Sequence, residues 1–463
     1  MATNLCSTER DLPRGVCALA QRSEVLPPPL RITMTETTPD NPVMVPSIQS
    51  ITLIQRLARR GLLKAFVNLR YGRLTIIEGE HTYYFEGPEN GPDAHIAVMD
   101  PQVWADVAFR GSVGSGEAYM AGYWTTPSLE QVTRLFVANG HLTDKMERGL
   151  TRFFRTLLKG VHWLNKNTIN GSKKNIEAHY DLGNQLFETF LDPTLMYSSA
   201  LFAKDEFDLH QASTEKLDHI CRKLHLTAND HVLEIGTGWG GFAVHAAAHY
   251  GCRVTTTTIS EEQFQHATQL VKDRGLTDQV TVLKEDYRAL TGRYDKLVSI
   301  EMIEAVGHHY LDTYVHTLSD RLKPNGIALI QAITIVEQRY RKAVKSVDFI
   351  KRYIFPGGFL PSIGSIMDSV GRASDLRLLH LEDFASHYAR TLAEWRKRFN
   401  AERAAIRQLG YDERFCRMWE FYLAYCEGGF TERQLGLAQL IFAKPLARQE
   451  APVTPLRLAS CGH

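Results

Sequence analysis

The sequence of 463 residues lacks the features that would indicate a disulfide framework, a zinc site or a membrane span. Its seven cysteines are odd in number and form no CxxC pair, which favours a reducing compartment over paired disulfides or metal ligation. No run approaches the roughly 20 apolar residues that span a bilayer, and no apolar core of signal-peptide type stands near the start. The formal net charge of +1 gives no overall attraction to nucleic acid. We therefore expect a cytoplasmic protein that holds no metal and binds no nucleic acid.

The length and composition predict two globular domains. Residues 1–45 are rich in Pro, Ser and Thr and are expected to form a disordered leader, with Met34 as an alternative start. Residues 46–147 are expected to form a small α+β domain that associates with lipid. It opens with a basic amphipathic stretch at 51–74, followed by strand-like runs at 73–78, 81–85 and 95–99. Residues 116–124 then lead into helical residues up to about Asn139.

A second basic stretch, residues 148–175, contains no Asp or Glu and interleaves its Lys and Arg residues with large apolar side chains. Such a helix can lie on an anionic membrane surface. It can equally be an interdomain helix with a solvated face, followed by a linker, and the sequence leaves both interpretations open.

From about residue 176 the pattern alternates between short apolar runs and helical segments. The strands are expected at 231–235, 253–257, 280–283, 296–300 and 327–332, and the helices between them at 241–249, 261–272 and 310–322. This alternation predicts an α/β fold with an open, doubly wound and mostly parallel sheet. Residues 340–463 are expected to be mostly helical and to cap it, which makes 176–463 the catalytic domain.

The strongest motif is Val232–Gly241, a buried-strand pattern that runs into the turn Gly-Thr-Gly-Trp-Gly-Gly and then a helix. Glycines let the backbone turn tightly against a ligand, and the helix N-terminus that follows favours a carboxylate. The order G-x-G-x-G-G, with Glu234 two residues before the first glycine, resembles the first motif of class I S-adenosylmethionine-dependent methyltransferases. Thr258 and Gln263 then follow the second strand on the ribose side, and Asp286 and Tyr287 follow the third on the adenine side. The full predicted cofactor set is Tyr197, Ser198, Glu234, Gly236, Gly238, Gly240, Thr258, Gln263, Asp286 and Tyr287.

Further motifs carry a more specific resemblance. They are His179–Asn184, Met196–Ala200, Glu301–Gly307, Tyr353–Gly358 and Tyr422–Cys426. With these, residues 171–445 resemble the cyclopropane fatty acid synthases, which are related to the mycolic acid cyclopropane synthases. The N-terminal domain also looks like the extra domain of the full-length bacterial enzymes.

The resemblance implies methylene transfer from S-adenosylmethionine to the cis double bond of an acyl chain in a membrane phospholipid. The alkene would attack the sulfonium methyl group, and a base would then remove a proton from the new methyl group to close the ring. In the family a bound bicarbonate is that base. The resemblance places it in a polar cage, with Glu304 as the orienting carboxylate, and implies peripheral contact with the inner membrane face and a homodimer. The cage would be formed by Ser199, Glu304, Gln331, Ile333 and Tyr388.

The chain departs from the family pattern at three positions of this region. Many members have Cys in place of Ser199, and His in place of Ala305 and of Gln331. Ser and Gln still hydrogen-bond an anion but supply no titrating imidazole. Cys426 matches a cysteine once proposed as the family nucleophile. It is a candidate catalytic residue, although alkyl transfer to an alkene needs no covalent enzyme intermediate and a structural role explains it as well.

Other functions compete with this one. The same fold can methylate the alkene without closing a ring, which would leave a methylene or methyl branch. A methyltransferase acting on N or O of a small polar metabolite would have no need of the basic stretches or the aromatic C-terminal region. A lipid-binding module without enzymatic activity would leave the glycine motif without a purpose.

Overall fold

The computed structural model describes residues 51–142 and 183–448. The predicted disordered leader, the alternative start at Met34, the basic stretch at 148–175 and most of the His179–Asn184 motif lie outside the described residues. None of the described helices is both long enough and apolar enough to cross a membrane.

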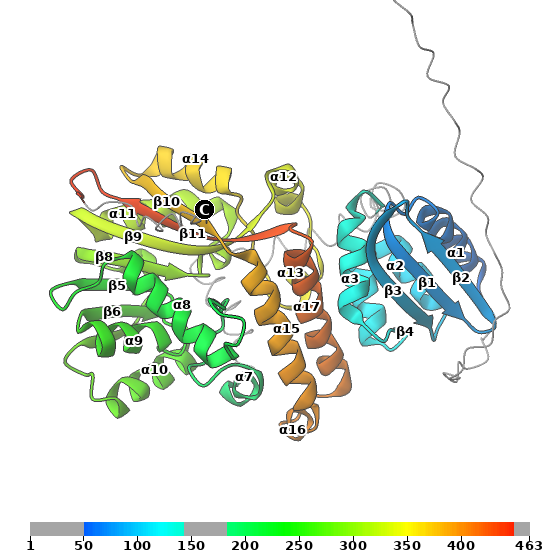
Figure 1. Ribbon diagram of the computed structural model, residues 1–463, viewed down its shortest axis with the longest axis horizontal. Coiled ribbons are helices and arrows are strands. Elements are labelled where there is room, and N and C mark those ends of the chain that lie inside the picture. Colours follow the sequence, from blue (N-terminus) through cyan, green and yellow to red (C-terminus); the bar gives the residue numbers. More distant parts are fainter. Residues whose placement is uncertain (1–50, 143–182, 449–463) are drawn as a thin grey trace, which may run out of the picture. The chain divides into compact units, whose positions relative to one another are not determined.

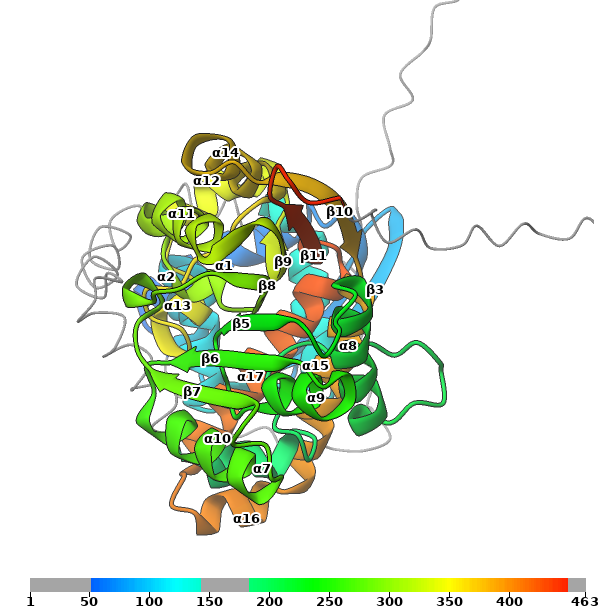
Figure 2. The same ribbon diagram turned by 90° about the vertical axis from the view of Figure 1, so that its left-hand side faces the viewer.

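The larger sheet has seven strands in the order β10-β11-β9-β8-β5-β6-β7 (Figures 1 and 2). The five strands from β9 to β7 are parallel. Their bounds are β5 His231–Ile235, β6 Arg253–Thr258, β7 Val280–Lys284, β8 Tyr294–Ile300 and β9 Leu322–Ile335. This confirms the predicted α/β fold with a mostly parallel sheet, and all five predicted strands are present.

Helices cover both faces of this sheet, because successive side chains of a strand point to opposite sides. On one face Val232 and Val298 pack with α8, α9 and α10. On the other face Leu233 and Leu297 pack with α11 and α14. The bounds are α8 Leu209–Lys223, α9 Gly241–Tyr250, α10 Glu261–Asp273, α11 Leu311–Arg321 and α14 Ile363–Ala373. Short 3-10 turns, η1 Tyr287–Ala289, η2 Ile303–Ala305 and η3 His308–Tyr310, complete the loops after β7 and β8.

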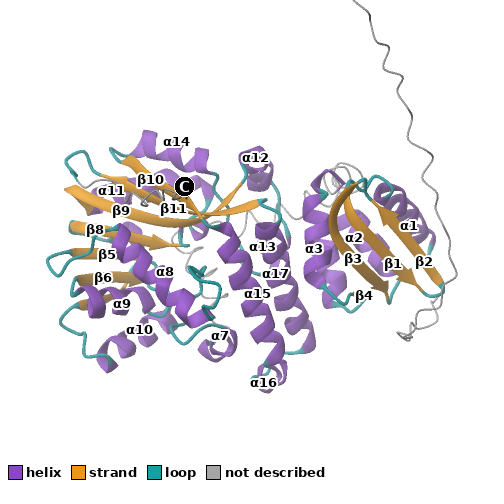
Figure 3. Ribbon diagram, in the orientation of Figure 1, coloured by secondary structure: helices purple, strands orange, loops and turns teal. Residues whose placement is uncertain are grey.

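The expectation that residues 340–463 are mostly helical was incomplete. Two further strands extend the sheet beyond β9, β10 Arg377–Asp383 and β11 Leu435–Ala443 (Figure 3). β11 pairs antiparallel with β9, and β10 pairs antiparallel with β11. The last seven residues of β11 are all buried, and only Gln439 among them is polar, so no alternation is visible in the sequence. A short apolar run of this kind cannot be distinguished from a buried helix by its periodicity.

The remaining helices of this domain gather aromatic side chains at the carboxyl ends of the parallel strands. Phe190 of α7 contacts the rings of Trp395 and Phe399 on α15 and of Trp419 on α17, with centroids 6.0 to 6.2 Å apart. The bounds are α7 Asn184–Phe190, α12 Glu337–Lys345, α13 Phe349–Tyr353, α15 Ala385–Ala401, α16 Arg403–Gln408 and α17 Glu413–Thr431. These helices form the helical cover that the sequence predicts.

Residues 53–138 form a second, four-stranded sheet in the order β2-β1-β3-β4, with three helices. The bounds are α1 Leu53–Phe66, β1 Tyr71–Glu78, β2 His81–Glu86, β3 Glu89–Val98, α2 Gln102–Met120, β4 Trp124–Thr125 and α3 Leu129–Ala138. The basic amphipathic helix ends at Phe66, earlier than the predicted stretch to residue 74. The helix α2 was not predicted; it contains Gly111, Gly114 and Gly116, and glycine is unfavourable in a helix interior.

Hydrogen bonds connect α17 to this smaller domain. Thr133 Oγ1 donates to the carbonyl of Ala424 at 2.8 Å, and Tyr119 donates to Glu420 at 2.9 Å. Gly428 lies so close to Thr133 that a Cβ on it would come within 2.8 Å of the threonine hydroxyl. The helix that covers the larger sheet is thus also held by the smaller domain.

Candidate active site

A cavity of about 430 Å³ lies at the carboxyl ends of the parallel strands. Strand β5 lies between β6 and β8 in the sheet, so the chain reverses its direction of winding between β5 and β8. In doubly wound sheets, ligands bind at this reversal point. The cavity has a polar half, lined by the glycine turn and the loops after β6 and β7. Its apolar half is lined by Phe355, Phe359, Leu360, Tyr425, Phe430 and Leu435.

The glycine turn after β5 adopts backbone conformations that side chains rarely tolerate. Gly236 has φ +103° and Gly238 has φ +53°, and both line the cavity. The backbone N–H groups of Gly236 and Thr237 donate to the carbonyl of Thr257 at 3.1 and 3.0 Å, which fixes the turn against β6. Gly240 does not line the cavity: its missing Cβ makes room for Ala267 of α10, 3.1 Å from where that atom would lie. The other nine residues of the predicted cofactor set all line the cavity.

The loops after β6 and β7 place hydrogen-bonding groups next to this turn. Thr258 Oγ1 donates to Gln263 Oε1 at 2.9 Å, so the two predicted ribose-side residues form one unit. Asp286 accepts two hydrogen bonds from the guanidinium of Arg288, at 2.7 and 2.6 Å. The same guanidinium lies 5.4 Å from the ring centroid of Tyr287. Residues 286–288 therefore form a rigid wall on the predicted adenine side.

A buried lysine, which the sequence analysis missed, lies behind the polar half. Lys216 of α8 is fully buried and donates from Nζ to Ser198 Oγ at 2.7 Å. Burial lowers its pKa to about 8, although Glu301, Asp192 and Glu234 act in the opposite direction. Its position was readable in outline, because Lys216 follows Leu209 and Ser213 and precedes Ile220 on the buried face of α8.

Glu234, within the glycine motif, is also buried, and it accepts a hydrogen bond from Thr256 at 2.6 Å. Burial raises its pKa to about 8. Near neutral pH this carboxyl is thus mostly protonated. It can donate a hydrogen bond into the cavity, as well as accept one.

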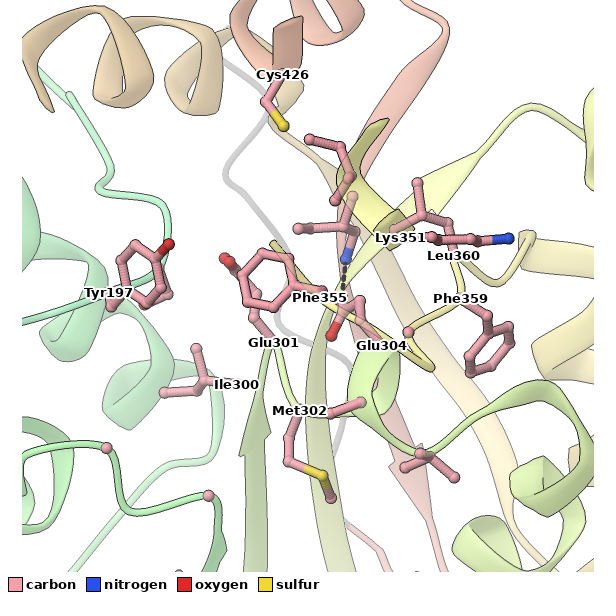
Figure 4. A pocket seen from close by; sticks show the side chains of 18 of the residues that line it. Tyr197, Ile300, Glu301, Met302, Glu304, Lys351, Phe355, Phe359, Leu360 and Cys426 are labelled. Carbon is pink, nitrogen blue, oxygen red and sulfur yellow. Dashed lines mark hydrogen bonds between the residues drawn. The ribbon is translucent and has the colours of Figure 1, made fainter. Parts of the chain in front are cut away.

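The side chain of Glu301, at the end of β8, collects three donors. Its Oε1 accepts from the backbone N–H of Ser199 at 2.9 Å and from Gln331 Nε2 at 2.8 Å, and its Oε2 accepts from the hydroxyl of Tyr388 at 2.6 Å. Three of the five predicted cage residues therefore surround this carboxylate. Burial raises the pKa of Glu301, and the three hydrogen bonds and Lys216 counteract that rise. Figure 4 shows Glu301 among the side chains that line the cavity, together with Tyr197, Glu304 and Phe355.

Glu304, the predicted orienting carboxylate, lies one turn further on, in η2 and not on a strand end. One of its oxygens accepts the backbone N–H of Ile333, and the other is buried without a hydrogen-bond partner among the described residues. Burial, and next the charge of Glu301, raise its pKa to about 8. Near neutral pH Glu304 is thus mostly protonated.

The predicted catalytic residues divide into two groups. Glu304, Ile333, Tyr388 and Cys426 line the cavity, whereas Ser199 and Gln331 lie behind Glu301 and do not. Gln331 is fully engaged, because its amide oxygen accepts from Gln439 at 2.9 Å. Cys426 lies away from the glutamates (Figure 4), and burial raises the pKa of its thiol. A thiol of this kind is a poor nucleophile.

Comparison with known proteins agrees with this geometry. The family model for mycolic acid cyclopropane synthetase matches residues 167–440. The chain belongs to this family. It is 37% identical over 359 residues to cyclopropane-fatty-acyl-phospholipid synthase of Escherichia coli strain K12, covering 76% of this chain and 88% of the relative. It is 38% identical over 348 residues to tuberculostearic acid methyltransferase UfaA1 of Mycobacterium tuberculosis, covering 71% and 78%.

Solved structures of family members have the same fold. Mycolic acid cyclopropane synthase CmaA1, in complex with SAH and CTAB, matches 59% of this chain and 98% of its own with a TM-score of 0.55 and 29% identity. The cyclopropane synthase MmaA2 of Mycobacterium tuberculosis gives the same TM-score at 27% identity. The chain is thus an S-adenosylmethionine-dependent methyltransferase of this family. The positive-φ glycine turn and the polar loops around it fit this cofactor.

Proposed function

We propose that the protein transfers a one-carbon unit from S-adenosylmethionine to the cis double bond of an unsaturated acyl chain in a membrane phospholipid, forming a cyclopropane ring. The observation that carries the proposal is the composition of the cavity. The glycine turn, two buried glutamates and an apolar half line one continuous cavity. The aromatic and aliphatic walls of the apolar half suit an acyl chain. A methyltransferase for a small polar metabolite would need polar groups where this cavity has aromatic and aliphatic walls.

When bound, S-adenosylmethionine supplies an electrophilic methyl group. The protein has to position the alkene and protect the positive charge that develops on the acyl chain. The walls formed by Phe355, Leu360 and Phe430 exclude water, which would trap that charge. Tyr197 and Tyr388 present aromatic rings to the same space, and ring faces stabilise a nearby cation. The hydroxyl of Tyr197 is held by that of Tyr422 at 2.9 Å, so the ring is fixed before the acyl chain enters.

The resemblance implies a bound bicarbonate as base, and the residues present do not fit that anion. The donors of Ser199, Gln331 and Tyr388 are already used by Glu301, and the N–H of Ile333 is used by Glu304. An anion at the same place would meet the carboxylate of Glu301 at close range, and within this set only the second carboxyl oxygen of Glu304 has no hydrogen-bond partner in the described part of the chain. We therefore derive no step through bicarbonate.

Positive charge beside the cavity supports a phospholipid acceptor. Residues 337–353 contain six Lys or Arg residues against two acidic ones, and Arg339 and Lys351 of this segment line the cavity. Basic residues beside an apolar cavity can hold a phosphate group while the acyl chain enters. On α1, Leu53, Ile54 and Leu57 are 69%, 60% and 58% exposed beside basic residues, a composition typical of helices that lie on a membrane surface.

A second candidate is methylation of the same double bond without ring closure. It is favoured by the similarity to a relative named a tuberculostearic acid methyltransferase. Both reactions share the attack of the alkene on the methyl group, and both then need a base. They differ in which bond the electron pair forms after proton removal.

The experiment that tests the proposal uses the purified protein, S-adenosylmethionine labelled in its methyl group, and phosphatidylglycerol vesicles with either monounsaturated or saturated chains. We expect label in the lipid fraction only with the monounsaturated chains. Label in neither lipid, with transfer instead to a water-soluble amine or hydroxyl compound, would favour the small-molecule methyltransferase.

A further inference from the structure

Glu301 has a strained backbone conformation that packing alone does not explain. It is one of only four non-glycine residues with positive φ among residues 51–142 and 183–448, at φ +49°. A non-glycine residue in this conformation is strained, and such strain is concentrated at functional sites. Its backbone N–H donates to the carbonyl of Gln331 at 2.8 Å, which fixes the conformation at the junction with β9.

Glu301 lies in the cavity beside the predicted cofactor site. It directly follows β8, which is paired with β5 on one side and with β9 on the other. The carboxylate therefore stands at the reversal point of the sheet, next to the glycine turn that the cofactor requires. Its side chain lines the cavity together with Met302 and Glu304.

Burial raises the pKa of Glu301, and its hydrogen-bond partners and Lys216 act against that rise by favouring the ionised form. Hydrogen bonds to a carboxylate favour its charged form, and here a backbone N–H, an amide and a hydroxyl all donate to it. The buried Lys216 of α8 contributes a favourable charge. Glu304 of η2 and Tyr388 of α15 are the other titratable groups that face it, and both hold their protons near neutral pH.

Resting on the proposed function, we infer that Glu301 is the catalytic base of this enzyme and that its carboxylate takes the place of a bound anion. After the alkene has attacked the methyl group, a C–H bond of that new methyl group breaks. The proton passes to a carboxylate oxygen of Glu301, and the C–H electron pair forms the last C–C bond of the ring. Glu301 leaves the step as a carboxylic acid and returns its proton to solvent before the next turnover.

This assignment also accounts for the residues around it. Ser199 and Gln331 do not reach the cavity, so they act on the reaction through Glu301 as positioning residues. A neutral amide at 331 suits that task, because it donates one hydrogen bond to Glu301 and accepts another from Gln439. An imidazolium there would hold the carboxylate too tightly for it to accept a proton.

The test begins with the unchanged protein. Its rate on monounsaturated phosphatidylglycerol vesicles is measured in buffer depleted of carbon dioxide and again with added bicarbonate. We expect the two rates to agree within about twofold. Dependence of the wild-type rate on bicarbonate would overturn the assignment.

The second part of the test compares variants at Glu301 with a control variant. Glu301→Gln keeps the size of the side chain and is expected to lower turnover by about a hundredfold or more, the usual contribution of a general base. S-adenosylmethionine binding, measured by calorimetry, should stay near the wild-type value. Glu402→Gln, at an exposed glutamate, is the matched control and should have wild-type turnover. Full activity of Glu301→Gln would overturn the assignment.

A chemical-rescue experiment separates a base from a structural residue. Glu301→Gly suits the positive φ and leaves room for a small carboxylate, so added formate should restore part of its turnover, with no such effect on Glu301→Gln. Absence of labelled lipid with the wild-type protein would count against the proposed function itself. Wild-type activity together with an active Glu301→Gln variant would count against Glu301 alone.

Discussion

Tyr388 is the residue whose hydroxyl most directly controls the charge of Glu301. Its O–H donates to Glu301 Oε2 at 2.6 Å and so lowers the pKa of that carboxyl. Hydrogen bonds to charged groups contribute about 1.5–3 kcal/mol, and one pH unit corresponds to about 1.4 kcal/mol. Tyr388→Phe should therefore raise the pKa of Glu301, and the acid limb of the kcat–pH profile should move about one to two units upward.

The acid limb moves upward because Glu301 is active only in its ionised form. Only ionised Glu301 can accept a proton, so activity is lost as the pH falls through its pKa, and a higher pKa moves this loss to higher pH. Tyr84→Phe is the matched control, because Tyr84 also donates to a glutamate, at 3.2 Å, but on an exposed strand. An unchanged acid limb in Tyr388→Phe would contradict the link between the two residues.

Cys426 tests whether a covalent enzyme intermediate takes part. Burial raises the pKa of its thiol, so little thiolate forms near neutral pH. Cys426→Ala should keep turnover within about threefold of wild type, apart from a modest loss of stability from the small cavity that it creates. Cys416→Ala, at another buried cysteine of α17, is the control. A hundredfold loss in Cys426→Ala alone would show that the thiol is used.

At this scale the sequence predicted more about the cofactor than about the base. Nine of the ten predicted cofactor residues line the cavity, because the glycine motif and the strand order fix where they lie. Glu301 belongs to the motif Glu301–Gly307, but the sequence alone did not predict a catalytic role for it. Its importance depends on donors from residues 199, 331 and 388, which only the fold brings together. Its left-handed backbone is likewise invisible in the residue type.

The elements that were predicted best are those with a clear period and turn signals on both sides. β5 has the predicted bounds, because glycine turn material follows it directly. β10 and β11 were missed, because they are separated by α15, α16 and α17 along the chain and pair only in the folded sheet. Such long-range pairing leaves no local pattern.

The helix α12 and the segment after it are expected to contact the phosphate groups of the membrane. Arg341 and Lys345 are exposed on α12. Replacing both with Gln should weaken binding to vesicles that contain phosphatidylglycerol, measured by flotation, by about fivefold or more, since each basic residue near such a surface contributes about 1 kcal/mol. Binding to neutral vesicles should change little. Leu53→Gln with Leu57→Gln on α1 should also weaken binding, but equally for both vesicle types.

Lys272 and Arg274, exposed at the end of α10, provide the matched control pair. Replacing them with Gln removes the same charge from the whole molecule. If this pair weakened vesicle binding as much as the α12 pair, then net charge alone, and no local surface on α12, would explain the attraction.

At the scale of the whole molecule, a doubly wound sheet supplies the cofactor turn, and a cover of helices supplies an apolar space in which a cation can survive. The sequence predicted this division. It did not predict that the polar centre between the two halves would be completed by a side chain of the protein itself. The fold explains this, because β8 pairs with β5, and Glu301, which follows β8, lines the same cavity as the glycine turn that follows β5.

The most direct test of the account is the lipid composition of a bacterial host that lacks cyclopropane lipids and expresses this chain. Fatty acid methyl esters are separated and their masses are measured by mass spectrometry. Any ester of increased mass is then examined by proton NMR, because a cyclopropane ring and a methylene branch give the same mass. We predict monounsaturated chains that have gained one CH2 and show the upfield signals of cyclopropane protons. Olefinic methylene signals would establish the branched product instead, and monounsaturated chains of unchanged mass would contradict the account.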